Sequence, residues 1–291
     1  MTQALLEQVV NGLMAGSVYV LVALGMVLIY GVMNVVNFAH GVLFTIGGYL
    51  AYFFYSHLIG SYVVATLLSM LSLGVIGVVL ERGIFRPLSG NLRNQVIASL
   101  GLILVLENLV VVLWGPNALQ WKIASTEQLV SFGPLRFSVH HLMVIAITML
   151  LVILLGLFLK FTRFGTAIRA TSQSQEAALV VGIPVQRVQW TTFAIGSMLA
   201  AVGGALVGPL FLVFPQMGDI PLIKGLAGIL LGGMGSVPGA VVGGLILGVT
   251  ESVSTLFLPT DYRDSIAFLM MVAILLVRPQ GLFGVRMRGE D

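Results

Sequence analysis

The stretch Val9–Tyr30, VVNGLMAGSVYVLVALGMVLIY, decides the fold. It contains no charged residue and is as long as the run of about 20 apolar residues that a helix needs to cross a bilayer core. A secretory signal peptide has a shorter apolar core, of about 7–15 residues, preceded by basic residues. The residues before Val9 contain no Lys or Arg, so we predict a retained membrane helix.

The composition of the whole chain agrees with this assignment. Of its 291 residues, 58% are hydrophobic and 9% are charged, and the mean hydropathy is +1.06. Soluble domains carry about 25% charged residues, so most of this surface is expected to face lipid. The net charge of +3 does not indicate nucleic-acid binding, because the basic residues lie between apolar stretches. The chain has no cysteine, which excludes disulfides and thiolate metal sites.

Long apolar stretches recur along the chain. The clear candidates for membrane spans are 9–30, 62–80, 95–113, 140–160, 189–211, 237–258 and 264–278. Two shorter segments, 42–56 and about 221–234, are interrupted by glycine or proline. These runs do not alternate, and a lipid-exposed backbone must satisfy its own hydrogen bonds, so helices are favoured over a β-barrel. We predict an all-α polytopic membrane protein, a single domain over 1–291 with about eight or nine transmembrane segments including the two short ones.

The basic residues predict the orientation, since short cytoplasmic loops are enriched in Lys and Arg. Three segments are basic: 81–94 with Arg82, Arg86 and Arg93; 160–188 with Lys160, Arg163, Arg169 and Arg187; and the C-terminal tail with Arg278, Arg286 and Arg288. We place all three in the cytoplasm. If both short segments cross the membrane, then 114–139, 258–265 and the N-terminus lie outside.

Glycines spaced by four recur within the apolar stretches. The pairs are Gly12/Gly16, Gly204/Gly208, Gly228/Gly232, Gly239/Gly243 and Gly244/Gly248. Small residues at this spacing let helix backbones approach closely in lipid. The pattern is consistent with internal packing and with packing against a second membrane subunit, and the sequence leaves both open.

The two short segments are also where polar residues interrupt the apolar pattern. Asn34, Asn37 and His40 precede the first of them, and Lys224 lies in the second. A pair of short, Gly- or Pro-broken segments in corresponding halves of a chain indicates a substrate path. We therefore predict that these four side chains line a translocation path.

A structural role is an alternative for three of these residues. Asn34 and Asn37 are also suited to cap a helix that begins near Gly41. His40 is also suited to simple packing. No other His, Asp or Glu stands at metal-ligand spacing from it, so no metal site is expected.

Two acidic residues lie inside apolar stretches, Glu107 in LILVLENLVVVLW and Glu251 in LILGVTESVSTLF. Charges at membrane depth are costly and are functional candidates by default. They are expected to be protonated, paired with Lys224, or used for ion coupling. The last possibility defines an alternative function, an ion-coupled secondary carrier for a small polar solute.

The polar interval at about 161–188 is the longest of the predicted cytoplasmic segments. Its residues have helical spacing and stop at Gly182, which is followed by Pro184, a typical helix end. A short amphipathic helix here is suited to docking into a groove of a partner or to lying on the bilayer surface.

Glu176, Ala177, Ala178 and Gly182 in this loop resemble the EAA-x-x-x-G motif of ABC-importer permeases, in which the loop carries a coupling helix. Four longer stretches resemble one branch of that family: NGLMAGSVYVLVALGMVLIYGVMNVVNFAHG, ERGIFRPLSG, RATSQSQEAALVVGI and LAGILLGGMGSVPGAVVGGLILGVTE. Over nearly its whole length the chain is similar to permeases of branched-chain amino acid (LivH-type) importers.

This resemblance implies a multi-pass subunit of a bacterial-type inner (plasma) membrane. Its implied partners are a second permease subunit, favoured to be a different chain, two cytoplasmic ATPases and an extracytoplasmic solute-binding protein. Arg169, Glu176, Ala177, Ala178 and Gly182 are then the residues that couple to the ATPase. The implied substrates are branched-chain amino acids, while relatives that take urea, amides or aromatic acids keep the choice of solute open.

The residues themselves indicate a non-catalytic chain. There is no Gly-Lys pair, so the phosphate loop of an ATPase is absent, and ATP and Mg²⁺ would be used by partner subunits. There is also no HExxH motif, and the serines and carboxylates show no nucleophile–base spacing. We expect no cofactor in this chain.

Overall fold

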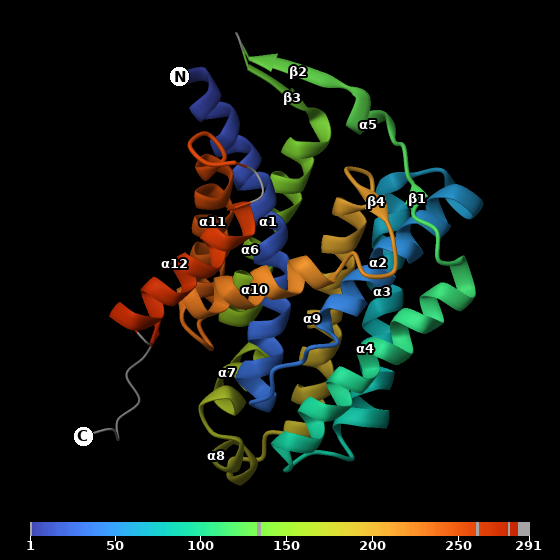
Figure 1. The fold of residues 1–291 in the computed structure, drawn as a ribbon. Helices are drawn as coiled ribbons and strands as arrows, with labels where there is room; N and C mark the ends of the chain where they lie inside the picture. Colours follow the sequence, from blue (N-terminus) through green and yellow to red (C-terminus); the bar gives the residue numbers. More distant parts are fainter. Residues whose placement is uncertain (1, 133–134, 260–261, 279, 285–291) are drawn as a thin grey trace.

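The computed structural model describes residues 2–132, 135–259, 262–278 and 280–284. Figure 1 shows a bundle of helices with only short strands. The helices are α1 (Thr2–Met33), α2 (His40–Phe54) with the π-helix η1 (Tyr55–Ile59), α3 (Tyr62–Leu80) with the π-helix η2 (Glu81–Phe85), α4 (Leu92–Trp114), α5 (Ala124–Glu127), α6 (Val139–Phe161), α7 (Arg163–Gln173), α8 (Gln175–Val180), α9 (Val185–Val207), α10 (Asp219–Gly232), α11 (Val237–Ser254) and α12 (Arg263–Val277). The strands are β1 (Leu119–Gln120), β2 (Leu129–Phe132), β3 (Leu135–Ser138) and β4 (Leu212–Val213), paired β1 with β4 and β2 with β3, both antiparallel.

Within the described residues, seven helices are long and apolar enough to cross a membrane. They correspond to α1, α2 with η1, α3 with η2, α4, α6, α9 and α11. This confirms the prediction of an all-α polytopic membrane protein.

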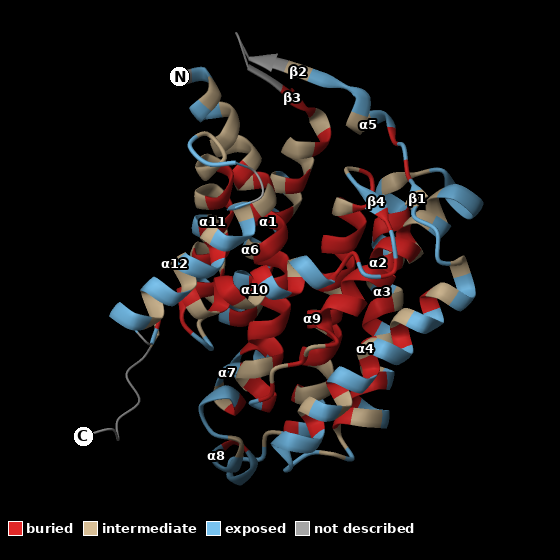
Figure 2. Ribbon diagram, viewed as in Figure 1, coloured by how far each residue is buried: buried red, intermediate tan, exposed pale blue. Residues whose placement is uncertain are grey.

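Burial divides the bundle into a centre and a periphery. The most apolar window of α1 is 83% buried and that of α9 is 78% buried, against 22% for α4 and 17% for α6. Figure 2 shows the same contrast, with buried residues concentrated on α1 and α9. The exposed side chains of α4 and α6 are largely Leu, Ile and Val, as expected of a face that contacts lipid tails.

The first of the two short segments is longer than predicted. Helix α2 runs directly into η1, so the helical segment covers His40–Ile59, 20 residues. Gly47 and Gly48 do not break it. A Cβ atom on either residue would press against the backbone of α9, at Ala201 and Gly204 respectively. These glycines therefore let α2 approach α9.

The second segment differs from the predicted crossing. Helix α10 has only 14 residues. A helix that crosses the hydrocarbon core of a bilayer needs about 20 residues, so α10 is too short for a straight crossing. Figure 1 shows α10 lying across the bundle, roughly perpendicular to α1. Helix α12, with 15 residues, is also shorter than such a crossing requires.

The glycine pairs pack inside this chain. Gly12 and Gly16 of α1 face Gly244 and Gly248 of α11, and a Cβ on Gly12 would lie 2.6 Å from Cα of Val249. Gly228 and Gly232 of α10 similarly face Gly239 and Gly243 of α11. Gly204 packs on Phe44, and Gly208 packs on the Trp121 ring. Internal packing is thus sufficient to account for the spacing-by-four pattern.

Two of the three predicted cytoplasmic segments, 81–94 and 160–188, lie at one end of the molecule. Figure 1 shows α7, α8 and the α3–α4 connection at the bottom, and the N-terminus, β1–β4 and α5 towards the opposite end. We call these the α8 end and the N-terminal end. Arg286 and Arg288 of the predicted basic tail lie outside the described residues.

Candidate translocation path and coupling loop

Asn34 and Asn37 form the turn between α1 and α2. Asn34 has φ +55°, and its N–H donates to the Tyr30 carbonyl at 2.7 Å, which ends α1. Asparagine is one of the few residues that adopt this left-handed conformation readily. Oδ1 of Asn37 accepts a hydrogen bond of 3.1 Å from Ala39 N, in the turn directly before α2. The structure therefore corrects one detail of the capping alternative, because Asn34 ends α1 instead of starting α2.

His40 is fully buried at the beginning of α2. Its ring lies against Gly25 of α1, where a Cβ would come within 2.6 Å of Nε2. Within the described part of the chain, neither ring nitrogen of His40 has a hydrogen-bond partner, and neither does Nδ2 of Asn37. That same part contains no group of three or more His, Cys, Asp or Glu residues that could hold a metal ion. His40 thus combines close packing with unused polar atoms at the α1–α2 junction.

Lys224 lies in a different place, among charged residues of three helices. It is 6% exposed, its Nζ pairs with Oε1 of Glu251 from α11, and it lies 2.7 Å from Oδ1 of Asp264 from α12. Nε of Arg263 lies 2.8 Å from the same Glu251 oxygen, as an ion pair without hydrogen-bond alignment. Tyr19 of α1 donates to the other Glu251 oxygen at 3.0 Å. We call these five residues the ion cluster.

The ion cluster borders a cavity of about 650 Å³. The wall is formed by α1, α6, the α9–α10 connection, α10, α11 and α12. The lining residues are Gln8, Asn11, Met14, Ala15, Val18, Tyr19, His141, Val207, Phe211, Leu212, Phe214, Met217, Ile220, Pro221, Lys224, Ser252, Thr255, Arg263 and Asp264. Of the four predicted path residues, the structure brings only Lys224 to this cavity. Asn34, Asn37 and His40 lie at the α1–α2 turn instead.

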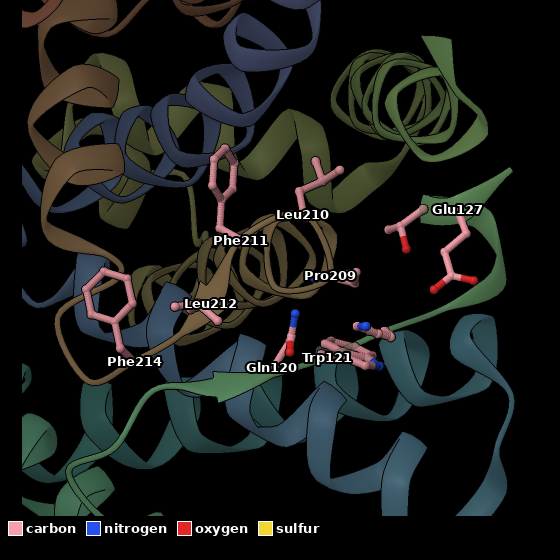
Figure 3. Close-up of a pocket in the computed structure, with 10 residues that line it drawn as sticks. Gln120, Trp121, Glu127, Pro209, Leu210, Phe211, Leu212 and Phe214 are labelled. Carbon is pink, nitrogen blue, oxygen red and sulfur yellow. The ribbon is translucent and has the colours of Figure 1, made fainter. Parts of the chain in front are cut away.

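A second hollow of about 560 Å³ opens at the N-terminal end. Figure 3 shows its side chains coming from two segments, Gln120–Glu127 and Pro209–Phe214. The pairing of β1 with β4 holds these two segments together. This hollow carries one base, Lys122, and one acid, Glu127, both exposed.

The two intramembrane acids have different surroundings. Glu251 is 1% exposed and has three partners in the ion cluster, so the predicted pairing with Lys224 is present. Glu107 is half-buried on α4, and no hydrogen bond or ion pair joins it to the described residues. The sequence did not identify Tyr19, Arg263 or Asp264. The sequence does contain a signal for two of them, because Arg263 and Asp264 form a charged pair directly before an apolar run.

The predicted coupling loop folds into the two helices α7 and α8. Thr162 caps α7 by accepting from Gly165 N at 2.9 Å, and Ser174 caps α8 by accepting from Ala177 N at 3.1 Å. Helix α8 ends at Val180 and is followed by Gly182, whose φ of +80° is one that L residues rarely adopt. Its N–H donates to the Leu179 carbonyl at 3.0 Å. The local sequence thus specifies both ends of α8.

The C-terminal end of α8 is apolar and accessible. Glu176 and Ala177 are exposed on it, and Ala178 is buried. The three residues that follow are strongly exposed: Leu179 at 59%, Val180 at 87% and Val181 at 73%. We call Leu179–Val181 the apolar tip. Arg169 lies on α7, where Nη2 is 3.5 Å from Oγ1 of Thr166 in the same helix.

One side chain connects α8 to the core. Nε2 of Gln175 donates a hydrogen bond of 2.6 Å to the carbonyl of Val32, in the last turn of α1. Val32 is buried, and the opposite end of α1 lines the large cavity. A single helix therefore connects the surface of the α8 end with the ion cluster.

Comparison with known proteins gives a consistent result. The family model described as the permease component of branched-chain amino acid transport systems matches residues 8–275. The chain is 32% identical to the high-affinity branched-chain amino acid transport system permease protein LivH of Salmonella typhimurium, over 96% of this chain and 95% of that protein. It is 32% identical to the corresponding protein BraD of Pseudomonas aeruginosa, with the same coverage. It is 28% identical to a probable LivH of Methanocaldococcus jannaschii, over 91% of this chain and 88% of that one.

The match covers six of the seven long apolar helices completely and α1 from Gln8 onwards, and it includes α7, α8 and α10. It therefore extends over both the ion cluster and the coupling loop. The chain belongs to the family of permease components of branched-chain amino acid transport systems.

Proposed function

We propose that this chain is one of two permease subunits of an ATP-driven ABC importer, which carries branched-chain or related amino acids across the inner (plasma) membrane. Its partners in this proposal are a second, different permease chain, two cytoplasmic ATPases that use ATP and Mg²⁺, and an extracytoplasmic solute-binding protein. The names of the relatives support the transport of branched-chain amino acids.

The single observation that carries the proposal is the apolar tip. Leu179, Val180 and Val181 are exposed at the end that the basic loops place in the cytoplasm. Such a short helix presenting apolar side chains is suited to a groove on a partner protein. The ATPase subunits are the partner that an importer without its own phosphate loop requires.

The mechanism follows from the path between this tip and the cavity. Movement of a docked ATPase displaces α8, and Gln175 transmits the displacement to the end of α1 through Val32. Helix α1 packs on α9, α10 and α11, so its shift moves the walls of the cavity against one another. The chain itself makes no chemical change in the solute. Arg169, Glu176, Ala177, Ala178 and Gly182 shape or present the coupling loop.

An ion-coupled carrier is the competing function. The ion cluster argues against a carrier that uses Glu251 as its coupling site. Glu251 is held by Lys224, Arg263 and Tyr19, so its charge is compensated inside the protein. Removing a partner from a buried charge is costly, which makes Glu251 a poor site for a proton or Na⁺ that must come and go.

Co-purification tests the proposed assembly. The chain is tagged, extracted in mild detergent from its native membrane, and its companions are identified by mass spectrometry. Two ATPase subunits and a second permease are expected, and the Val180→Asp variant is expected to lose the ATPases while keeping the permease. Recovery of the chain alone, or only with copies of itself, would contradict the proposal.

A further inference from the structure

We propose that the cavity beside the ion cluster is a binding site for a zwitterionic α-amino acid, with Arg263 and Lys224 facing the carboxylate and Asp264 facing the ammonium group. This inference rests on the proposed function and specifies how this chain recognises the solute during translocation.

The ion cluster has unused binding capacity. Glu251 is saturated, because both of its oxygens have partners. Asp264 uses only Oδ1, and its side chain is 60% exposed. Arg263 uses only Nε, its side chain is 37% exposed, and its terminal nitrogens have no partner among the described residues. One carboxylate oxygen and one guanidinium edge therefore remain available at the cavity wall.

These two groups have the chemistry that a zwitterion requires. A guanidinium group binds a carboxylate through two parallel hydrogen bonds, and a carboxylate accepts from an ammonium group. Arg263 and Asp264 are neighbours in the first turn of α12, so their backbones are fixed relative to each other. Lys224 of α10 adds a second positive charge, and its Nζ lies 2.7 Å from Oδ1 of Asp264.

The rest of the wall suits an aliphatic side chain. Helix α1 contributes Met14 and Val18, and the connection before α10 contributes Phe214 and Met217. Ligand sites typically combine an apolar lining with a few convergent polar groups, in volumes of about 300–1,000 Å³. The cavity, at about 650 Å³, lies within this range.

Charge balance predicts which solutes are accepted. Lys224 and Arg263 are compensated by Glu251 and Asp264, so the cluster is neutral before the solute arrives. A zwitterion with an apolar side chain keeps it neutral, whereas lysine or glutamate would bring an uncompensated charge, which is costly away from water. Urea and simple amides carry neither a negative nor a positive charge, so they cannot pair with both Arg263 and Asp264. The site therefore favours leucine-type amino acids over the other solutes taken by similar permeases.

Photolabelling of the complete transporter tests the site. The probe is photo-leucine, the diazirine analogue of leucine, applied to the purified complex of this chain with its partner subunits. Labelled peptides are expected to include Met14–Tyr19 or Phe214–Ile220. Excess leucine is expected to suppress the label. Two analogues are not expected to suppress it: 4-methylpentanoate, which lacks the ammonium group, and 3-methylbutylamine, which lacks the carboxylate.

Two variants and two controls sharpen the comparison. Asp264→Asn and Arg263→Gln are each expected to lower labelling by roughly tenfold or more. Each variant loses a hydrogen bond between the protein and a charged group of the solute, and such a loss weakens binding by about this factor. Both side chains are partly exposed, and Glu251 keeps Lys224 and Tyr19 as partners in both variants, so both are expected to assemble normally on size-exclusion chromatography. Glu127→Gln and Lys122→Gln, in the second hollow, are matched charge removals that leave labelling unchanged.

The outcomes separate this inference from the function on which it rests. ATP-driven leucine uptake is measured with the same wild-type preparation. If uptake is present but the label falls outside the cavity, or if both variants label like wild type, the binding site is wrong and the importer stands. If the assembled complex does not transport leucine at all, the proposed function fails and the site fails with it.

Discussion

Nε2 of Gln175 donates a 2.6 Å hydrogen bond to the Val32 carbonyl, and this bond joins the first residue of α8 to the last turn of α1. The two residues are far apart in sequence and belong to different parts of the proposed mechanism. Gln175 lies in the proposed coupling loop, whereas Val32 is buried in the central helix. In the proposed mechanism, this bond is the point at which a movement of the ATPase enters the bundle.

Gln175→Ala is expected to separate ATP hydrolysis from transport. Loss of one neutral hydrogen bond costs about 1 kcal/mol, so we expect uptake per ATP hydrolysed to fall roughly fivefold while ATPase activity persists. The measurement is the ratio of leucine uptake to phosphate release in proteoliposomes. Gln173→Ala, at the end of α7, removes an exposed glutamine that makes no such bond and serves as the control. Equal ratios for both variants would remove Gln175 from the coupling path.

Gly182→Val is expected to abolish uptake while the chain stays in the membrane. A side chain at φ +80° is strained by about 1–2 kcal/mol, and strain here opens the turn that ends α8. Asn tolerates this conformation, so Gly182→Asn is expected to retain partial uptake. Gly156→Ala on α6 is the control, because a Cβ there meets no atom within 4 Å. Normal uptake by the Val variant would contradict the role of this turn.

Val180→Asp is expected to weaken association with the ATPase subunits by about tenfold or more, because Val180 is the most exposed residue of the apolar tip. The measurement is the amount of ATPase that co-purifies with the tagged chain. Leu129→Ser changes an apolar residue that is 65% exposed at the N-terminal end, and it is expected to leave association intact. If both variants lose the ATPases equally, the effect is not specific to the tip.

Gly248→Val is expected to destabilise the bundle at the contact between α1 and α11. A Cβ at this position would meet the backbone of Gly16 and Gly12, and overpacking of this kind costs about 1–3 kcal/mol. We expect a lower melting temperature of the purified chain in detergent. Gly101→Val, on a part of α4 where a Cβ meets no atom within 4 Å, is the matched control. An unchanged melting temperature for Gly248→Val would show that α11 does not pack here.

The sequence predicted those features that follow from local pattern. Runs of about 20 apolar residues identified the long helices, since little else can cross a membrane. Gly182 followed by Pro184 correctly marked the end of α8. The glycine spacing predicted close helix contacts, and the structure shows that they lie within the chain.

The features that depend on tertiary structure were not predictable in this way. Hydropathy does not specify tilt, so the transverse course of α10 could not be read from its apolar residues. The ion cluster unites residues as distant as Tyr19 and Asp264, and only the folded bundle brings them together. Asn34 was predicted to line the path, with capping of α2 as the alternative, and the positive φ with which it ends α1 has no separate signal in the sequence.

The most direct test of the central claim is leucine uptake by proteoliposomes that contain this chain with its co-purified partners. ATP is supplied on the side of the ATPases, the binding protein is supplied on the other side, and ionophores remove all ion gradients. We predict accumulation of L-leucine that requires ATP and is unaffected by the ionophores. Accumulation that persists without ATP and collapses with the ion gradient would contradict the importer and return Glu107 and Glu251 to consideration as coupling sites.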